Sequence, residues 1–363
     1  MSDLKALLIF LSQFDLTTNK IKQVLDYLGE NASIKEFKKA KFDKAKIFTS
    51  EALGKMIDSA DDNLVKTFVV NLAERGIKIV CKFDDDYPQS LFDLDDAPYI
   101  LYYKGDLSLT NRPCLSVVGT RKPTSYGRAI TERLVRDVAS AGVVIISGLA
   151  YGIDSIAHRK CLEVGGKTIA VLAGGFDHIY PNEHQGLANE IAEKGLLISE
   201  YRPKKSSTKY SFPLRNRIVA GLSKGVLITE ASLKSGTIHT KDFALDYGRD
   251  VFAVPGNIDS INSSLTNEII KRGQGFVVTE AKDILDKFGE IQQPTKTEKG
   301  EIDLSSFSAE EQQILSQLST GMKTIDELAK NCSFSINIFN SYLTTLEISG
   351  IINRMPGGYI TLN

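Results

Sequence analysis

The chain has 363 residues, 42% hydrophobic and 25% charged, which is an ordinary composition for a globular protein of two or three domains. Its formal net charge is −1, so any binding site for a polyanion must be a local patch. The four cysteines lie far apart and form no C-x-x-C pair, which argues against a disulfide or zinc framework. The apolar run "ALLIFL" is too short for a signal peptide or a membrane span, and we expect a cytoplasmic protein.

Residues 1–75 show only helical periodicity, with Leu4, Leu7, Leu8 and Leu11 on one face, and they predict a small helical domain. Over residues 77–288 the pattern changes to short apolar runs separated by polar segments of helix length. The runs are "CLSVVG", "VVIISG", "TIAVLAGG", "LLISE", "GVLITEA", "VFAVPG" and "FVV". Strands that are apolar on both faces and are joined by helices predict an α/β fold with a Rossmann-like, doubly wound parallel sheet.

The remaining residues form a linker and a small C-terminal domain. Residues 289–302, "GEIQQPTKTEKGEI", contain few large aliphatic side chains and predict a flexible linker. Residues 303–363 contain three helical segments followed by two short strands around Pro356-Gly357-Gly358. Three helices and a β-hairpin predict a winged helix.

Glycine-rich loops follow three of the predicted strands: "GTRKPTSYG", "SGLAYGID" and "SLKSGT". Loops after parallel strands gather at one edge of the sheet, where ligands bind, and exposed N–H groups at a helix start suit an anion. We expect a phosphate on the N–H groups of Ser147 to Gly152, beside a helix that Asp154 caps. The first loop lacks G-x-G-x-x-G and no G-x-x-x-x-G-K-[ST] motif occurs, so we predict neither a nicotinamide nor an ATP cofactor.

The strongest compositional signal is "YRPKKSSTKYSFPLRNR", residues 201–217, which we call the basic segment. It has no acidic residue and three interleaved aromatic residues, Tyr201, Tyr210 and Phe212. Its six basic residues are Arg202, Lys204, Lys205, Lys209, Arg215 and Arg217. Basic groups follow a phosphate backbone and aromatic faces stack on unpaired bases, so the segment favours single-stranded nucleic acid.

The sequence does not specify a catalytic set. No G-x-S-x-G motif is present, and the four histidines have neither the spacing nor the cysteine neighbours of a metal site. His158 lies one turn into a predicted helix, and we interpret it as a packing residue. Three carboxylates, Glu230, Asp154 and Asp177, lie near predicted sheet ends but form no recognisable acid/base arrangement.

Taken together, the chain resembles the DprA/Smf family of DNA-processing proteins. The resemblance covers nearly the whole chain. It includes "VVGTRKPTSYGR", "SGLAYGIDSIAH", "TIAVLAGGFDHIYPNEH", "SFPLRNRIVAGLS", "EASLKSGT" and "RDVFAVPGNID". The C-terminal residues resemble the family's winged-helix domain, and the N-terminal helices loosely resemble its SAM-like domain.

The resemblance implies a non-enzymatic recombination mediator that binds single-stranded DNA and loads the recombinase RecA onto DNA taken up in natural transformation. It also implies a homodimer formed through the Rossmann-like domain. Combined with the basic segment, it predicts this DNA-binding set: Arg121, Ser147, Gly148, Lys209, Phe212, Arg215, Asn216, Arg217, Ser235 and Gly236.

Two alternatives stay open. The glycine loops also resemble those of lysine-decarboxylase-like phosphoribohydrolases, whose P-G-G-x-G-T-x-x-E motif carries a carboxylate. Here "KSGTIHT" retains Gly236-Thr237 but supplies no acid. The second alternative is a transcription regulator that reads DNA with the winged helix.

We predict that the winged helix is not the main DNA-binding part. Its third helix, roughly residues 335–350, contains no Lys or Arg, and residues 301–363 carry seven acids and three bases, a net charge of −4. Such a segment repels a polyanion. A chain ending near Gly289 should keep most of its affinity for single-stranded DNA in a gel-shift assay. Residues 301–363 alone should bind no DNA at physiological salt. A large loss of affinity on truncation, with dimerisation intact, would favour the transcription regulator.

Overall fold

The computed structural model describes residues 1–42, 47–289, 307–318, 323–332, 334–349, 351–355 and 359–362. The chain divides into two units, Met1–Gln292 and Gln293–Asn363. Of the predicted linker, only Gly289 lies among the described residues. In the described part of the chain, no helix is long and apolar enough to cross a bilayer.

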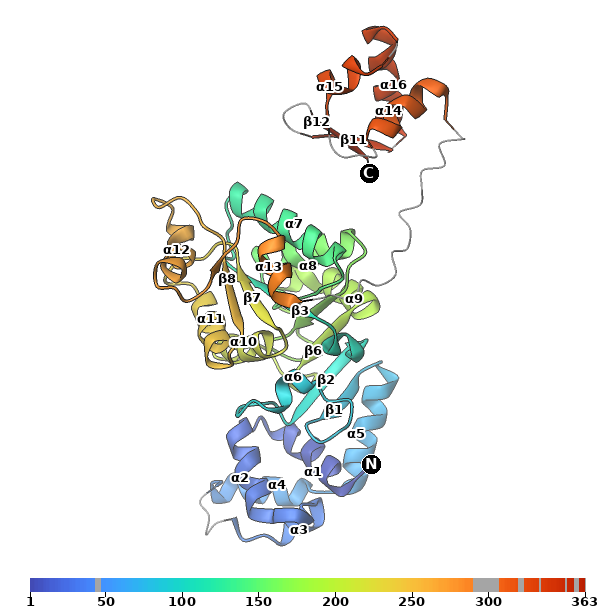
Figure 1. The fold of residues 1–363 in the computed structure, drawn as a ribbon. Coiled ribbons are helices and arrows are strands. Elements are labelled where there is room, and N and C mark those ends of the chain that lie inside the picture. Colours follow the sequence, from blue (N-terminus) through green and yellow to red (C-terminus); the bar gives the residue numbers. More distant parts are fainter. Residues whose placement is uncertain are drawn as a thin grey trace. The chain divides into compact units, whose positions relative to one another are not determined.

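A nine-stranded sheet organises the larger unit (Figure 1). Its order is β1-β2-β6-β5-β4-β3-β7-β8-β9, and every neighbouring pair from β6 to β9 is parallel. The seven predicted runs form the parallel strands: β3 (Cys114–Val118), β4 (Val144–Ser147), β5 (Thr168–Val171), β6 (Leu196–Ser199), β7 (Gly225–Ile228), β8 (Asp250–Ala253) and β9 (Phe276–Val277). The predicted doubly wound, Rossmann-like fold is confirmed.

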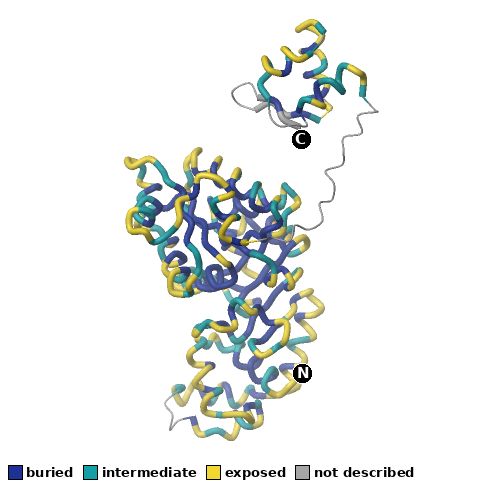
Figure 2. The backbone as a smooth tube through the Cα atoms, in the orientation of Figure 1, coloured by how far each residue is buried: buried dark blue, intermediate teal, exposed yellow. Residues whose placement is uncertain are grey.

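Helices cover both faces of this sheet, which is why its strands are apolar throughout. Leu115 and Val117 of β3 pack into one core with α7 (Ser125–Ser140), α8 (Ile153–Glu163) and α13 (Lys282–Phe288). Cys114 and Val118 of the same strand pack into the opposite core, with α10 (Ser211–Gly221), α11 (Thr237–Asp246) and α12 (Ser264–Lys271). Successive side chains of a strand point to opposite faces, so both faces are buried. Figure 2 shows the strands as dark, buried segments between more exposed helices.

Two antiparallel strands, which the pattern of runs did not predict, extend the sheet at one edge. β1 (Lys78–Cys81) pairs with β2 (Ile100–Gly105), and β2 pairs antiparallel with β6; the short α6 (Gln89–Phe92) lies between β1 and β2 in sequence. This edge joins the sheet to the N-terminal helices. The Tyr102 hydroxyl on β2 lies 2.5 Å from Ser12 Oγ, and Lys5 Nζ lies 2.6 Å from Asp84 Oδ2.

The N-terminal helices are α1 (Asp3–Leu11), α2 (Thr18–Leu28), α3 (Ile34–Lys39), α4 (Ser50–Ser59) and α5 (Asp62–Glu74). They enclose an aromatic cluster in which Phe37 contacts both Phe10 and Phe42. The structure changes from helix to strand near the predicted boundary at residues 75–77. The two sides nevertheless share one hydrophobic core that includes Tyr102, so a separate N-terminal domain remains a proposal.

The smaller unit contains α14 (Ala309–Leu318), α15 (Ile325–Lys330) and α16 (Ile336–Ile348). Its sheet has the order β10-β12-β11, with β10 (Lys323–Thr324), β11 (Ile352–Met355) and β12 (Tyr359–Leu362). Buried Leu315, Phe339 and Ile360 form its core. The predicted winged helix is confirmed, whereas the turn at residues 356–358 lies outside the described residues. In the larger unit, α9 (Gln185–Lys194) packs against β2, β5 and β6.

Candidate functional site

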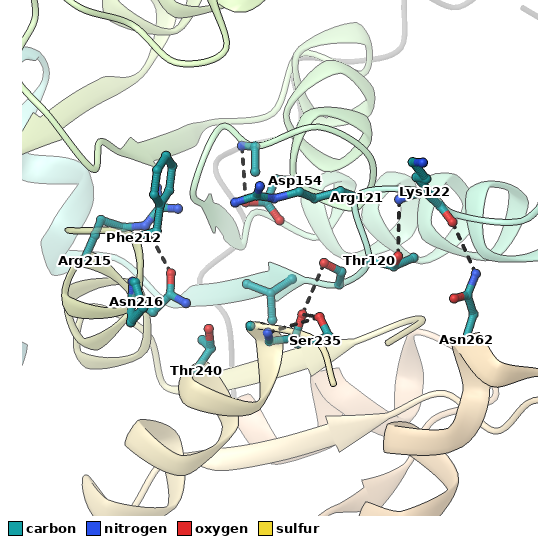
Figure 3. Close-up of a pocket in the computed structure, with 16 residues that line it drawn as sticks. Thr120, Arg121, Lys122, Asp154, Phe212, Arg215, Asn216, Ser235, Thr240 and Asn262 are labelled. Atoms are coloured by element: carbon teal, nitrogen blue, oxygen red, sulfur yellow. Dashed lines mark hydrogen bonds between the residues drawn. The ribbon is translucent and has the colours of Figure 1, made fainter. Parts of the chain in front are cut away.

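The strand order reverses between β3 and β7, and a cavity of about 600 Å³ lies at this point. Crossovers leave these two neighbouring strands in opposite directions, so their loops separate and create a crevice at the carboxyl edge of the sheet. Figure 3 shows side chains from several loops converging on it. The cavity is lined by Val118, Gly119, Thr120, Arg121, Lys122, Ala150, Asp154, Phe212, Pro213, Arg215, Asn216, Ser235, Gly236, Thr237, Thr240 and Asn262.

Direct hydrogen bonds hold the loops around the cavity together. Thr120 of the β3–α7 loop donates its N–H to the Glu230 carbonyl after β7, at 2.7 Å. The Thr120 carbonyl accepts from the N–H of Ile153, at 3.2 Å. Gly152 has φ 76°, and a Cβ there would lie 2.3 Å from the Thr120 carbonyl oxygen. The glycine is therefore required by both the left-handed backbone and the close approach of the two loops.

Six of the ten predicted DNA-binding residues line this cavity, and four do not. The six are Arg121, Phe212, Arg215, Asn216, Ser235 and Gly236. The other four are Ser147, Gly148, Lys209 and Arg217.

The expectation of a phosphate on the Ser147–Gly152 loop is wrong, because a carboxylate of the chain occupies part of that position. Asp154 Oδ2 accepts the N–H groups of Gly148 (3.1 Å) and Ala150 (3.4 Å). Between them, Leu149 has φ 60°, a left-handed conformation that directs both N–H groups to one anion. Asp154 is also not the helix cap: α8 begins at Ile153, so Asp154 lies in its first turn.

Ser147 and Gly148 form the layer beneath the cavity. Ser147 is fully buried, and its hydroxyl donates to the Val117 carbonyl at 2.6 Å. The Gly148 carbonyl accepts from Arg215 Nη1 at 2.5 Å. Ser147 therefore has a structural role, whereas Gly148 shapes the floor of the site and also lines a small cleft beside Tyr180 and Phe212.

Arg215 supplies a buried positive charge below the cavity. Its Nη1 donates to the Gly148 and Val171 carbonyls, and its Nε donates to Asn216 Oδ1 at 3.2 Å. Burial lowers the pKa of Arg215 to about 10, so the group is still a cation at neutral pH, and the nearby Asp154 favours that charge. Burial raises the pKa of Asp154, although Arg215 and the two loop N–H groups favour its charged form.

Two exposed cations and the half-buried ring of Phe212 line the cavity. The Arg121 guanidinium lies over the Phe212 ring, 5.3 Å from its centroid. Tyr180, which the sequence analysis missed, meets Phe212 edge to face with centroids 5.3 Å apart. Lys122 is exposed beside Arg121, and its carbonyl accepts from Asn262 at 3.2 Å. This combination can bind phosphates and stack on bases.

Lys209 and Arg217 lie away from the cavity lining. Lys209 is exposed, with Nζ 5.0 Å from the Tyr210 ring centroid. Arg217 is 6% exposed, and its Nη2 lies 2.5 and 2.6 Å from the two oxygens of Glu200. Burial favours a lower pKa for Arg217, but the Glu200 and Asp96 carboxylates outweigh it and raise the pKa. The structure thus places Arg217 in a buried ion pair.

The three carboxylates near the sheet edge all have structural partners. Glu230 accepts from the N–H and hydroxyl of Thr124 at the start of α7 (2.9 and 2.6 Å), Asp177 pairs with Arg75, and Asp154 holds the glycine loop. His158 is buried with Nδ1 2.7 Å from Thr168 Oγ1, and burial lowers its pKa to about 3. In the described part of the chain, no cluster of His, Cys, Asp and Glu is arranged to hold a metal ion.

Some cavity residues could have been found from the sequence and others could not. Lys122 follows Arg121 directly in "GTRKP", and Thr240 lies one helical turn after Gly236. Asn262 comes from the segment after β8, where no basic or glycine-rich pattern marks a site.

Comparisons with known families and structures agree with this architecture. Residues 78–289 match the family described as DNA recombination-mediator protein A, and residues 296–358 match the DprA winged helix domain. The DNA processing protein DprA of Bacillus subtilis is 39% identical over 218 residues, which cover 60% of this chain and 73% of that protein. The protein Smf of Escherichia coli is 37% identical over 287 residues, which cover 76% of this chain and 75% of that protein.

Two solved structures share the fold. DNA processing protein A from Streptococcus pneumoniae superposes with a TM-score of 0.68 at 35% identity, covering 77% of this chain and 96% of that one. DNA processing protein A from Helicobacter pylori gives a TM-score of 0.53 at 34% identity, covering 58% of this chain and 94% of that one. The latter structure is described as showing a unique single-stranded DNA binding mode.

The packing beneath the cavity generates a prediction about two of its glycines. A Cβ on Gly148 would lie 2.3–2.5 Å from three atoms of the Arg215 guanidinium, whereas one on Gly236 would meet nothing within 4 Å. Gly148→Ala should lower the free energy of unfolding by about 1–3 kcal/mol, because Arg215 must shift. Gly236→Ala should change it by less than about 0.5 kcal/mol. Urea titration of both variants checks this, and equal stability would show that Arg215 is not held as described.

Proposed function

The chain belongs to the DNA recombination-mediator protein A family, which includes proteins named DprA and Smf, and from this premise we propose that it binds single-stranded DNA at the cavity between β3 and β7. Arg121 and Lys122 would contact phosphates. Phe212 would stack on a base once the Arg121 side chain, which rests on its ring, moves to a phosphate.

One observation carries this proposal: the cavity gathers cations and an aromatic side chain from separate loops at the ligand-binding edge of the sheet. Three cations, Arg121, Lys122 and Arg215, line it with a single carboxylate, Asp154. That carboxylate already accepts two backbone N–H groups, so it opposes a bound phosphate less than a free acid would. A nucleotide chain, with its alternating charges and flat bases, matches such a surface.

The aromatic side chains favour a single strand over a duplex. Phe212 lines the cavity, and Tyr180, whose ring contacts Phe212, is 47% exposed. A duplex keeps its base faces stacked inside, where these rings cannot reach them. The two asparagine amides of the lining are engaged within the chain, since Asn216 Oδ1 accepts from Arg215 and Asn262 Nδ2 donates to the Lys122 carbonyl, so the binding should depend little on sequence.

We further propose that the protein acts without chemistry of its own as a cytoplasmic mediator that loads RecA onto single-stranded DNA during natural transformation. The family membership and the motifs quoted above support this role. A homodimer formed through the Rossmann-like part belongs to the same proposal. We include Lys209 as a phosphate contact beside the cavity, and we assign Arg217 to bracing α10.

The direct test is a competition between single- and double-stranded oligonucleotides of equal length. Binding is measured by fluorescence anisotropy at several salt concentrations. The single strand should bind at least about tenfold more tightly, since both stacking and phosphate contacts are available to it. Its affinity should also fall steeply as salt rises, because bound phosphates release counterions. Equal affinity for the two forms at moderate salt would contradict the proposal.

Three substitutions separate phosphate contacts from stacking. Arg121→Ala and Lys209→Ala should each reduce the slope of log affinity against log salt by about 0.7, the contribution of one phosphate contact to a single strand. Phe212→Ala should cost about 1–3 kcal/mol of binding free energy and leave that slope nearly unchanged. Phe212→Tyr keeps the aromatic face and serves as the control, with affinity near that of the parent. If Phe212→Ala changes the slope as the charge variants do, stacking is the wrong role for Phe212.

A further inference from the structure

A second cavity, of about 380 Å³, lies where the N-terminal helices meet the basic segment. It is lined by Gln13, Phe68, Asn71, Leu72, Arg75, Arg202, Pro203 and Lys204. One wall therefore comes from the N-terminal helices, mainly α5, and the other from the start of the basic segment. None of these residues belongs to the cavity between β3 and β7.

The charged residues that line this cavity are all cations. Arg75 pairs with Asp177, and Arg202 Nε lies 3.5 Å from Asp15 Oδ1. Lys204 is exposed and makes no ion pair with any described residue. Two partly neutralised guanidinium groups and one free ammonium group leave the cavity electropositive.

The rest of the lining is suited to the uncharged part of a nucleotide. Phe68 is half-buried, and its ring packs edge to face against Tyr102 with centroids 6.5 Å apart. Leu72 and Pro203 are buried beside it, whereas Gln13 and Asn71 add amide groups. Apolar walls with a few amides and cations fit a sugar and base that carry a phosphate.

The wall formed by the basic segment is held in a fixed position before any ligand arrives. The Pro203 carbonyl accepts the N–H of Asp177 at 3.0 Å, and the Lys205 carbonyl accepts the N–H of Gly175 at 2.7 Å. A Cβ on Gly175 would lie 2.1 Å from the Arg202 carbonyl oxygen, so the two loops can approach this closely only because residue 175 is glycine. A fixed wall lowers the entropy cost of binding.

The basic segment connects this cavity to the first one. Arg202 and Lys204 line the second cavity, and Phe212 lines the first. Between them, Ser207 and Phe212 line a small cleft together with Tyr180. A strand lying along residues 202–216 would therefore pass from one cavity to the other over an aromatic surface.

From this arrangement we propose that the cavity at Arg75, Arg202 and Lys204 is a second nucleotide-binding site, which takes a phosphate and base of the same single strand. The proposal rests on the proposed function, because it extends the path of a strand that occupies the first cavity. It gives the N-terminal helices a part in DNA binding.

The test measures the affinity of the full-length chain and of its variants for two oligothymidines. One has about 5 nucleotides and the other about 20, so that they bracket the usual site sizes. Lys204→Gln should weaken the long strand about three- to tenfold and reduce its salt slope by about 0.7. It should leave the short strand, which fills only the first cavity, within about twofold. Asn71→Glu adds a carboxylate to the exposed α5 wall and should weaken the long strand at least as much.

Matched controls on α5 carry the same charge changes at exposed residues outside the cavity lining. They are Lys66→Gln and Thr67→Glu, and both should bind the two strands as the parent does. The inference is overturned if Lys204→Gln and Asn71→Glu match their controls on the long strand. It is also overturned if both strands weaken equally, since the cavity would then not be a separate site.

Two further measurements separate this inference from its premise and from a free nucleotide. Arg121→Gln should weaken the binding of both strands. If this variant binds both strands as tightly as the parent does, the first cavity is not the DNA site, whatever the effect of Lys204→Gln. Titration with thymidine monophosphate should give only weak binding. The inference is overturned if the monophosphate binds tightly, Asn71→Glu abolishes that binding, and longer strands bind no more tightly than the monophosphate. The cavity would then be a site for a free nucleotide and not a second contact for the strand.

Discussion

The buried guanidinium of Arg215 is the interaction on which the site depends. Arg215 comes from α10, and its Nη1 joins that helix to the carbonyls of Gly148 and Val171, at the ends of β4 and β5. Burying a charge is costly unless hydrogen bonds and an opposite charge compensate for it. Here the two carbonyls supply the bonds, and Asp154 supplies the charge while holding the glycine loop. Because Phe212 and Asn216 lie on the same helix, fixing Arg215 also fixes their positions above the cavity.

The distribution of charge explains how a chain with a net charge of −1 can present a surface for a polyanion. Three acids around the cavity and the basic segment are already engaged: Glu230 at the start of α7, Glu200 with Arg217, and Asp15 with Lys205 at 2.8 Å. Arg121 and Lys122 remain exposed at the cavity. A local positive field of this kind is sufficient for phosphate binding, since exposed charges act over roughly 8 Å at physiological salt.

The sequence was informative where a physical requirement leaves a pattern along the chain. Parallel strands buried on both faces need continuous apolar runs, so the seven strands from β3 to β9 could be predicted. The antiparallel β1 and β2 were missed because they do not alternate with helix-length polar segments as the parallel strands do: only the four-residue α6 lies between them. The wrong placement of the phosphate had another cause: the sequence shows that Asp154 follows the glycine loop, but not that its side chain folds back onto the N–H groups.

Arg217 shows how helix geometry decides the role of a charged side chain. Side chains two residues apart on a helix point about 200° apart, whereas those three or four apart share a face. Phe212, Arg215 and Asn216 therefore lie together at the cavity, and Arg217 turns away to Glu200. The composition of the basic segment could not separate these residues, because their orientation depends on where α10 begins.

Mapping the path of bound DNA tests the account most directly. Oligothymidines that carry one photoreactive iodinated base at successive positions can be cross-linked to the full-length chain, and the modified peptides identified by mass spectrometry. The account predicts adducts in the peptide that contains Phe212 and in the peptide that contains Tyr180, with few in α16. Adducts concentrated in α16, with none in residues 201–217, would contradict it.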